Sequence, residues 1–138
     1  MEEACTATVL NMPRSGSSVD YGFQERVSDW LIKCFGAETA DDRLDRTHRF
    51  LEEALELAQA AGCSRDDALV LLSYVFSRPA GTVAGEVGGT MVTLAGMAQA
   101  HGVDMLVAGE AELARNHERT AAIREKRSRK PRNSPLPQ

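Results

Sequence analysis

Helix-ending residues divide this chain into short segments, and they limit its fold more than any other feature. Glycines stand at positions 36, 62 and 102, and prolines stand at positions 79 and 131. Between them, apolar residues recur at the three- and four-residue spacing of an amphipathic helix. The first such run consists of Val19, Phe23, Val27, Trp30, Leu31 and Cys34. Because glycine and proline end helices, the sequence predicts a succession of separate helices.

The composition also favours helices over strands. The chain holds 19 alanines and 13 leucines but only 2 isoleucines and 10 valines, and aromatic residues make up 5%. Strands select β-branched and aromatic side chains, whereas alanine and leucine favour helices. We therefore predict an all-α fold, a compact bundle of about five helices joined by short connections. The expected helices span about 20–35, 40–61, 64–78, 83–101 and 104–127.

The 138 residues are enough for one domain of ordinary size, which we place at 20–127. Residues 1–19 show no periodicity and are predicted to form a flexible N-terminal arm. Residues 128–138 are basic and contain prolines, so they are predicted to form a non-helical tail. Two helix starts are marked by capping residues, Ser64 and Asp104. The segment 68–76 is apolar most of the way round and is predicted to be the buried centre of the bundle.

Charge is distributed unevenly along the chain, whose net charge is −4. Residues 1–110 carry eight basic against 17 acidic residues, whereas 111–138 carry eight basic against three acidic residues. This asymmetry indicates either complementarity within the molecule or a phosphate-bearing ligand between the two regions, unless the basic end is only a solvated tail. Sequence-specific nucleic-acid binding is not expected, because aromatic residues are few and no recognition helix is evident.

The cysteines and the hydropathy pattern indicate the compartment. Cys5, Cys34 and Cys63 are odd in number and lack a CxxC spacing, so neither a disulfide framework nor a zinc knuckle is expected. No apolar run is long enough to span a membrane, and the N-terminus lacks a signal-peptide pattern. We expect a cytoplasmic protein without membrane contact.

Three carboxylates share one narrow face of the second expected helix. Glu52, Glu53 and Glu56 fall within about 100° of arc, and apolar residues border this arc on both sides. Like charges at this spacing repel one another, and a divalent cation would convert the repulsion into ligation. The alternative interpretation is a solvated acidic face, which an EExxE pattern alone does not exclude.

The fourth expected helix carries one isolated acidic residue. Glu86 is the only charged residue between Arg78 and Asp104, in a segment made of small and apolar residues. Four glycines lie in this helix and weaken it, which indicates either close approach of another backbone or room for a bulky ligand.

With these features the sequence resembles the all-α NTP pyrophosphohydrolases, and most of all the MazG-like proteins, over about residues 20–127. The resemblance rests on the EExxE helix, on the acidic residue about thirty positions later, and on the Gly-Val-Asp turn into a basic helix. It implies magnesium bound through an ExxE pair and a later ExxD pair. It also implies cleavage of a nucleoside triphosphate between its α and β phosphorus atoms.

Carried onto this chain, the resemblance assigns metal ligation to Glu53 and Glu56, with Glu52 completing the EExxE form, and to Glu86. The last ligand position of the family falls on Gly89, which has no side chain to ligate. This departure implies weaker metal binding, a ligand from elsewhere, or a protein that has lost activity. We favour the interpretation that another helix or the substrate packs against the Gly89 Cα, because three further glycines share this helix.

The last expected helix resembles the phosphate-contacting end of the family's last helix. Arg115, Asn116 and Arg119 are its candidate substrate-binding residues, because arginine binds phosphate oxygens in a bidentate manner. The alternative for the two arginines is a solvated surface. Trp30 is a candidate for stacking on the base, although aromatic residues at helical spacing usually lie in the core. His48 and His117 are interpreted as structural.

The sequence thus predicts a magnesium-dependent nucleoside triphosphate pyrophosphohydrolase, with manganese as a possible substitute. Glu53 or Glu52 would orient or deprotonate the attacking water. A homodimer or homotetramer is expected from the resemblance and from the apolar third helix. The alternative function is a catalytically decayed helical interaction protein with the same fold, whose basic tail binds a partner or nucleic acid.

Overall fold

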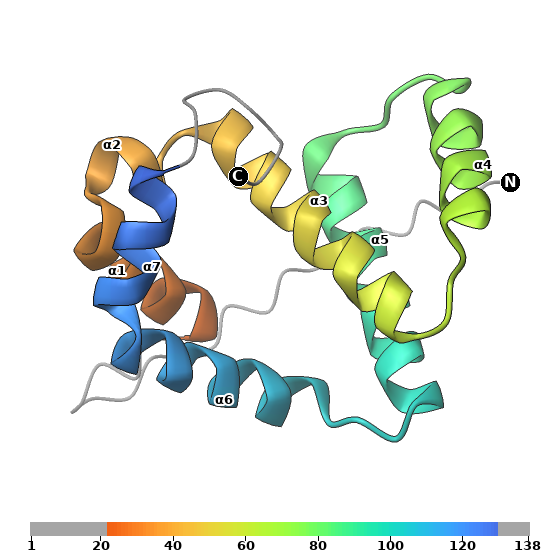
Figure 1. Ribbon diagram of the computed structural model, residues 1–138. Coiled ribbons are helices and arrows are strands. Elements are labelled where there is room, and N and C mark those ends of the chain that lie inside the picture. Colours follow the sequence, from red (N-terminus) through yellow and green to blue (C-terminus); the bar gives the residue numbers. More distant parts are fainter. Residues whose placement is uncertain (1–21, 130–138) are drawn as a thin grey trace, which may run out of the picture.

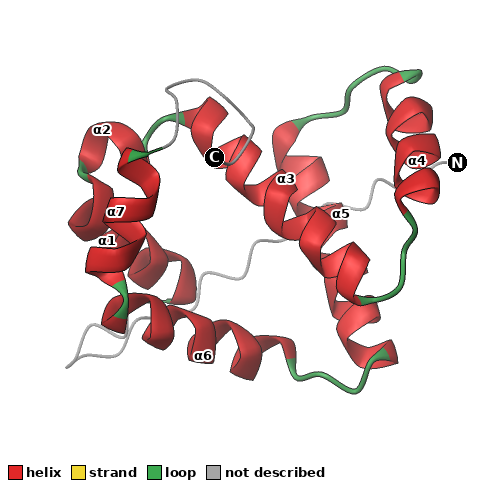
Figure 2. Ribbon diagram, in the orientation of Figure 1, coloured by secondary structure: helices red, strands yellow, loops and turns green. Residues whose placement is uncertain are grey.

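A computed structural model of the protein describes residues 22–129, which form seven α-helices without a strand (Figures 1 and 2). The helices are α1 (Phe23–Phe35), α2 (Ala37–Ala40), α3 (Arg43–Ala60), α4 (Arg65–Phe76), α5 (Val83–Ala100), α6 (Met105–Glu118) and α7 (Thr120–Ser128). The all-α prediction is confirmed. The predicted arm at 1–19 and most of the predicted tail lie outside the described residues. Within 22–129, every helix is too short or too polar to cross a membrane.

Side-chain caps begin four of the helices. Each capping oxygen accepts a hydrogen bond from the backbone N–H three residues later, which satisfies a donor that has no partner inside the helix. The caps are Asp42, Ser64, Thr82 and Asp104, at distances between 2.9 and 3.2 Å. The two caps predicted from the sequence, Ser64 and Asp104, are confirmed.

Left-handed glycines lie at or just beyond the ends of α1, α3 and α5. Gly36, Gly62 and Gly102 have φ angles of 82°, 92° and 66°, a region that side chains with a Cβ rarely adopt. The backbone N–H of Gly36 donates to the Ile32 carbonyl at 2.8 Å and thereby closes the last turn of α1. The predicted helix ends at these glycines are confirmed, because they depend on local backbone chemistry alone.

Two further helices differ from the prediction, because α2 lies in the expected connection before residue 40 and α7 results from a break in the expected last helix. The turn α2 follows Gly36, and the expected last helix is broken at Arg119, whose φ and ψ are −103° and 16°. Next to the break, the Thr120 hydroxyl donates to the carbonyls of Asn116 and His117, at 3.1 and 3.0 Å. A hydroxyl bonded to its own helix in this way competes with the backbone and bends the helix.

The hydrophobic core lies where α1, α6 and α7 meet. Its buried residues are Trp30, Cys34 and Leu113, surrounded by the partly buried Val27, Leu31, Phe35 and Ile123. The rings of Trp30 and Phe35 meet edge to face, with centroids 5.8 Å apart. In agreement, α1 packs closely against α2, α6 and α7. The helices α1, α2 and α7 lie together on one side of the molecule, and α6 extends from them along its lower edge (Figure 1).

The helix α4 is not the buried centre that the sequence predicts. All of its large apolar side chains are exposed, from Leu69 at 43% to Phe76 at 81%, and Ala68 alone is half-buried. Neither α3 nor α4 belongs to the helix pairs that pack most closely. The prediction is wrong because an apolar pattern shows that the side chains of a helix favour burial, but it does not show that other helices of the same chain bury them.

The basic helix α7 is fastened to the end of α1 by Arg124. Its Nε donates to the Cys34 carbonyl at 2.6 Å, and its Nη2 donates to the Lys33 carbonyl. The last carbonyls of a helix have no partner inside the helix, so a guanidinium at this end satisfies them and also complements the helix dipole. Burial raises the pKa of the neighbouring Cys34 thiol, although the positive charge of Arg124 opposes this effect.

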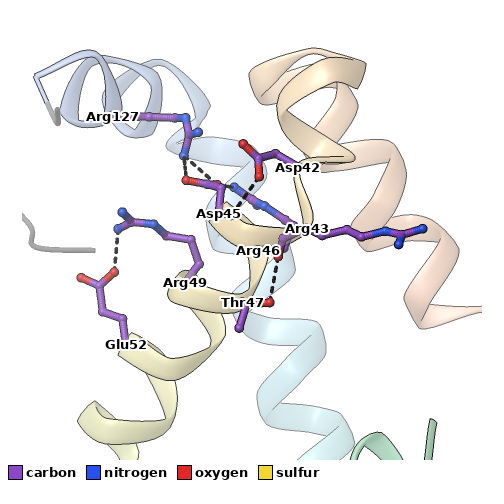
Figure 3. A network of polar contacts seen from close by, with 8 residues as sticks. All are labelled: Asp42, Arg43, Asp45, Arg46, Thr47, Arg49, Glu52 and Arg127. Carbon is purple, nitrogen blue, oxygen red and sulfur yellow. Dashed lines mark hydrogen bonds and ion pairs between the residues drawn. The ribbon is translucent and has the colours of Figure 1, made fainter. Parts of the chain in front are cut away.

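Asp45 joins α7 to the start of α3 (Figure 3). Its carboxylate accepts from Arg127 Nη1 at 3.1 and 3.2 Å, and it also pairs with Arg46. The two guanidinium carbons lie 5.1 and 5.7 Å from the ring centre of Phe35, within cation–π range. Burial acts to raise the pKa of Asp45, but the hydrogen bonds from Arg46 and Arg127 outweigh it and lower this pKa below its ordinary value.

Replacing this carboxylate by a neutral group should destabilise the fold. We predict that Asp45→Asn lowers the free energy of unfolding by about 1–3 kcal/mol, because two half-buried arginines lose their charged acceptor. A lowered pKa means that this stabilisation is present above the ordinary pKa of an aspartate. It is lost as the pH falls through the lower pKa of the folded protein. Urea unfolding between pH 7 and pH 3 measures both effects.

Asp42→Asn is the matched control, because asparagine caps a helix as well as aspartate does. It should leave the stability within about 0.5 kcal/mol of the native value. Equal effects of the two substitutions would show that the Asp45 ion pairs do not stabilise the protein.

Candidate functional site

The carboxylates of the EExxE pattern lie in the middle of α3 and differ in their surroundings. Glu53 and Glu56 are exposed, and neither forms an ion pair with a residue among 22–129. Glu52 is half-buried, and one of its oxygens accepts from Arg49 Nη1 at 2.6 Å (Figure 3). The pair Glu53 and Glu56 is therefore open to a cation, whereas a cation at Glu52 would compete with Arg49.

Glu86 lies in the first turn of α5, as the sequence predicts. Its carboxylate folds back over Gly81, where a Cβ would collide with it. A negative charge at this end of the helix is favourable, because it meets the positive end of the helix dipole. No three histidine, cysteine, aspartate or glutamate side chains in 22–129 approach closely enough to hold a metal ion, so the described chain does not gather the four predicted ligands.

Gly89 is open rather than closely packed. A Cβ built on it meets no atom within 4 Å, and the same holds for Gly88 and Gly96. The expectation that another helix packs against Gly89 is therefore wrong for the part of the chain that the structure describes. A longer side chain at this position would find space.

The two candidate phosphate-binding arginines at the end of α6 share an acidic neighbour. Arg115 and Arg119 are exposed, and both face Glu112, to which Arg115 is hydrogen-bonded and from which Arg119 lies 3.6 Å away. The amide oxygen of Asn116 accepts from Arg119 at 3.5 Å. Glu112 was not predicted, although its spacing of three and seven residues from the two arginines was visible in the sequence. A phosphate bound here would compete with this carboxylate.

Trp30 belongs to the core rather than to an exposed site. It is 8% exposed, and its indole N–H donates to the Thr120 hydroxyl at 3.4 Å. Its predicted role in stacking on a base does not agree with this position. The ordinary alternative, an aromatic residue of the core, is the one that the structure supports.

A shallow cleft of about 360 Å³ lies between α1 and α6. Its lining residues are Arg26, Asp29, Glu110, Leu113, Ala114 and His117. Arg26 and Glu110 form a two-pronged ion pair across it, and this hydrogen bonding lowers the pKa of Glu110. The sequence did not predict this pair, because 84 residues separate its members and no local spacing connects them. The cleft lacks the candidate metal and phosphate residues, and its ion pair ties two helices together.

Comparison of the chain with protein-family models, with curated protein sequences and with solved structures finds no match. The candidate site is therefore described by its own side chains. They are an exposed carboxylate pair on α3, a glutamate at the start of α5 and an exposed arginine pair at the end of α6, where Arg119 is the C-cap residue.

Removing the competing carboxylate on α6 should improve anion binding. We predict that Glu112→Gln binds inorganic pyrophosphate roughly two- to five-fold more tightly, because Arg115 and Arg119 lose a surface ion pair of ordinary strength. Isothermal titration calorimetry at low salt measures the change. Glu118→Gln, an exposed carboxylate of the same helix that forms no described ion pair, is the control. If both variants gain equally, general charge and not this arginine pair binds the anion.

Proposed function

We propose that the protein is a magnesium-dependent nucleoside triphosphate pyrophosphohydrolase that acts in the cytoplasm as a homodimer or homotetramer. It converts a ribo- or deoxyribonucleoside triphosphate into the monophosphate and pyrophosphate, as the resemblance to the MazG-like proteins implies. One observation carries the proposal. Glu53 and Glu56 lie one turn apart on α3, exposed and without an ion pair in the described chain, where the resemblance places the first metal pair.

The donor chemistry of these residues suits magnesium. Mg²⁺ prefers hard oxygen ligands and usually keeps several waters, so one or two carboxylates together with substrate phosphates are enough to bind it. Glu53 and Glu56 supply two, and Glu52 and Glu86 are the further ligands that the resemblance assigns. When bound, the metal would neutralise phosphate charge and lower the pKa of a bound water.

Side chains of the protein would activate the attacking water and hold the polyphosphate. Glu53, or Glu52 after release from Arg49, would orient or deprotonate the attacking water. Arg115 and Arg119 would hold the polyphosphate, with Asn116 beside them, after exchanging Glu112 for phosphate oxygens. Both arginines are exposed, which allows this exchange.

Two observations favour the second candidate, a catalytically decayed interaction protein. Gly89 cannot supply the expected ligand, and the four glutamates do not gather into one group in the described chain. Such a protein would keep the fold and bind a partner, with its basic C-terminal region as one contact. Product analysis separates the two candidates.

The proposed activity predicts defined products. Incubation with a panel of ribo- and deoxyribonucleoside triphosphates and Mg²⁺ should yield the monophosphate and pyrophosphate, as seen by ion-exchange chromatography and ³¹P NMR. Glu53→Gln should lower kcat/KM by at least about a hundredfold, the usual size of a lost catalytic group. Glu38→Gln, an exposed glutamate on α2, should leave the rate unchanged. Orthophosphate as the product, or no turnover of any nucleotide, would contradict the proposal.

Restoring the family's last carboxylate should strengthen the metal site. The open space around Gly89 can accept a side chain, so we predict that Gly89→Asp binds Mg²⁺ more tightly than the native protein. The rise of the melting temperature with millimolar Mg²⁺ reports this, because a ligand of the native state stabilises it. Gly89→Ala is the control, and without metal it should gain up to about 1 kcal/mol from its helix propensity. Loss of stability in both variants would show that the missing-ligand explanation is wrong.

A further inference from the structure

The basic helix α7 meets the first turns of α3 at a group of arginine side chains. Arg46 and Arg49 lie one turn apart on α3, and Arg127 of α7 binds the same carboxylate as Arg46 (Figure 3). The side chains of these three arginines are half-buried, between 24% and 29% exposed. They are called the arginine cluster below.

The arginine cluster carries more positive charge than its carboxylates neutralise. Arg46 and Arg127 share the carboxylate of Asp45. Arg49 pairs with Glu52. Three guanidiniums thus face two carboxylates, which leaves a surplus of positive charge in a half-buried place. Such a charge is screened less than one at the open surface and attracts anions more strongly.

A fourth guanidinium adds to this surplus. Arg124 donates to backbone carbonyls and forms no ion pair with a carboxylate among residues 22–129. Burial raises the pKa of the nearby Cys34 thiol, whereas three positive charges act to lower it. They are the charges of Arg124, Arg127 and Arg46. The positive field is therefore concentrated where α7 meets α1 and α3.

Two buried donors of the arginine cluster lack an acceptor. The Nε atoms of Arg46 and Arg49 are buried and form no hydrogen bond in the part of the chain that the structure describes. A buried donor without an acceptor is unfavourable, because it has lost water without a replacement. Nε and one Nη of a guanidinium form the fork that binds two oxygens of a phosphate. An oxyanion would therefore supply the acceptors that the described chain does not.

We infer that the arginine cluster binds a phosphate-type oxyanion, with Arg49 as the principal donor. Arg49 would exchange the Glu52 carboxylate for oxygens of the anion and use its Nε in the same step. Arg46 and Arg127 would stay on Asp45 and stabilise the anion by their charge. Both are held over the Phe35 ring, so their positions are fixed before the anion arrives.

The site lies beside the candidate metal ligands. Arg49 precedes Glu52 by three residues and Glu53 by four, a spacing that makes side chains neighbours on a helix. The helix α6 is not among the helices that pack closely against α3 in the described chain, so the α6 arginines form a separate anion site. The inference rests on the proposed function only for the identity of the anion, which would then be a phosphate group of the nucleotide.

Binding of inorganic pyrophosphate tests the inference. The measurement uses the Arg115→Gln, Arg119→Gln double variant, in which the α6 arginines are removed. One pyrophosphate per chain should still bind in isothermal titration calorimetry at low salt. Adding Arg49→Gln should raise the dissociation constant at least tenfold. Arg65→Gln, at an exposed arginine of α4 that forms no described ion pair, is the matched control and should change it less than twofold.

Two results would overturn the inference. The first is that the double variant binds no pyrophosphate, and the second is that Arg49→Gln and Arg65→Gln weaken binding equally. If Arg49→Gln does not fold by circular dichroism, Arg49→Lys supplies the measurement. Lysine keeps the charge beside Glu52 but has no fork, so the dissociation constant should rise at least threefold. An unchanged value in Arg49→Lys would also overturn the inference.

Glu52→Gln removes the carboxylate that competes with the anion for Arg49. It should bind pyrophosphate roughly two- to five-fold more tightly, the size expected for a lost ion pair of ordinary strength. Weaker binding in this variant would contradict the exchange.

Competition experiments identify the source of the anion. Displacement of pyrophosphate by ATP but not by adenosine would show that the site takes the phosphates of a nucleotide. Displacement by inorganic phosphate but not by ATP would show that it takes a free anion. Displacement by adenosine would overturn the inference, because adenosine carries no phosphate. Pyrophosphate binding by a protein that hydrolyses no nucleotide would contradict the proposed function alone, whereas hydrolysis without pyrophosphate binding at the arginine cluster would contradict this inference alone.

Discussion

The contact between α7 and α1 is the interaction on which the described structure depends. The Thr120 hydroxyl accepts a hydrogen bond from the indole N–H of Trp30, and the Arg124 guanidinium donates to the last carbonyls of α1. Both residues follow the helical break at Arg119, where α6 ends and α7 begins. Without these contacts, α7 would no longer cover the buried cluster of Trp30, Cys34 and Leu113.

The same contact positions the helix that bears the candidate metal ligands. Arg127, three residues after Arg124, forms an ion pair with Asp45 in the first turn of α3. Arg46 also pairs with Asp45, and its guanidinium lies over the Phe35 ring. The helix α3 is tied to the core through charge and through a cation–π contact rather than through close helix packing. Its middle, where the EExxE carboxylates lie, consequently remains open to solvent and to ligands.

Local chemistry made much of the fold predictable. Ser64 and Asp104 begin helices, and Gly36, Gly62 and Gly102 end them, because capping and left-handed backbone depend on a few adjacent residues. The short α2 was not predicted because this four-residue turn after Gly36 carries no apolar periodicity of its own, and the break at Arg119 was not predicted because helical periodicity continues through it. The break coincides with a hydrogen bond from Trp30, which lies 90 residues away from Thr120.

The candidate site also has features that adjacent residues determine and features that depend on tertiary contacts. The sequence by itself determined which side chains share a helical face, so it placed Glu52, Glu53 and Glu56 together and could have revealed Glu112 beside Arg115. The sequence could likewise have revealed that Glu52 lies beside Arg49, three residues earlier on the same helix. Only the tertiary structure decided that Trp30 is buried, that Gly89 is open and that α4 is uncovered. The physical reason is that a repeat along one helix records which side chains avoid water and which lie side by side, whereas the elements that bury them lie elsewhere in the chain.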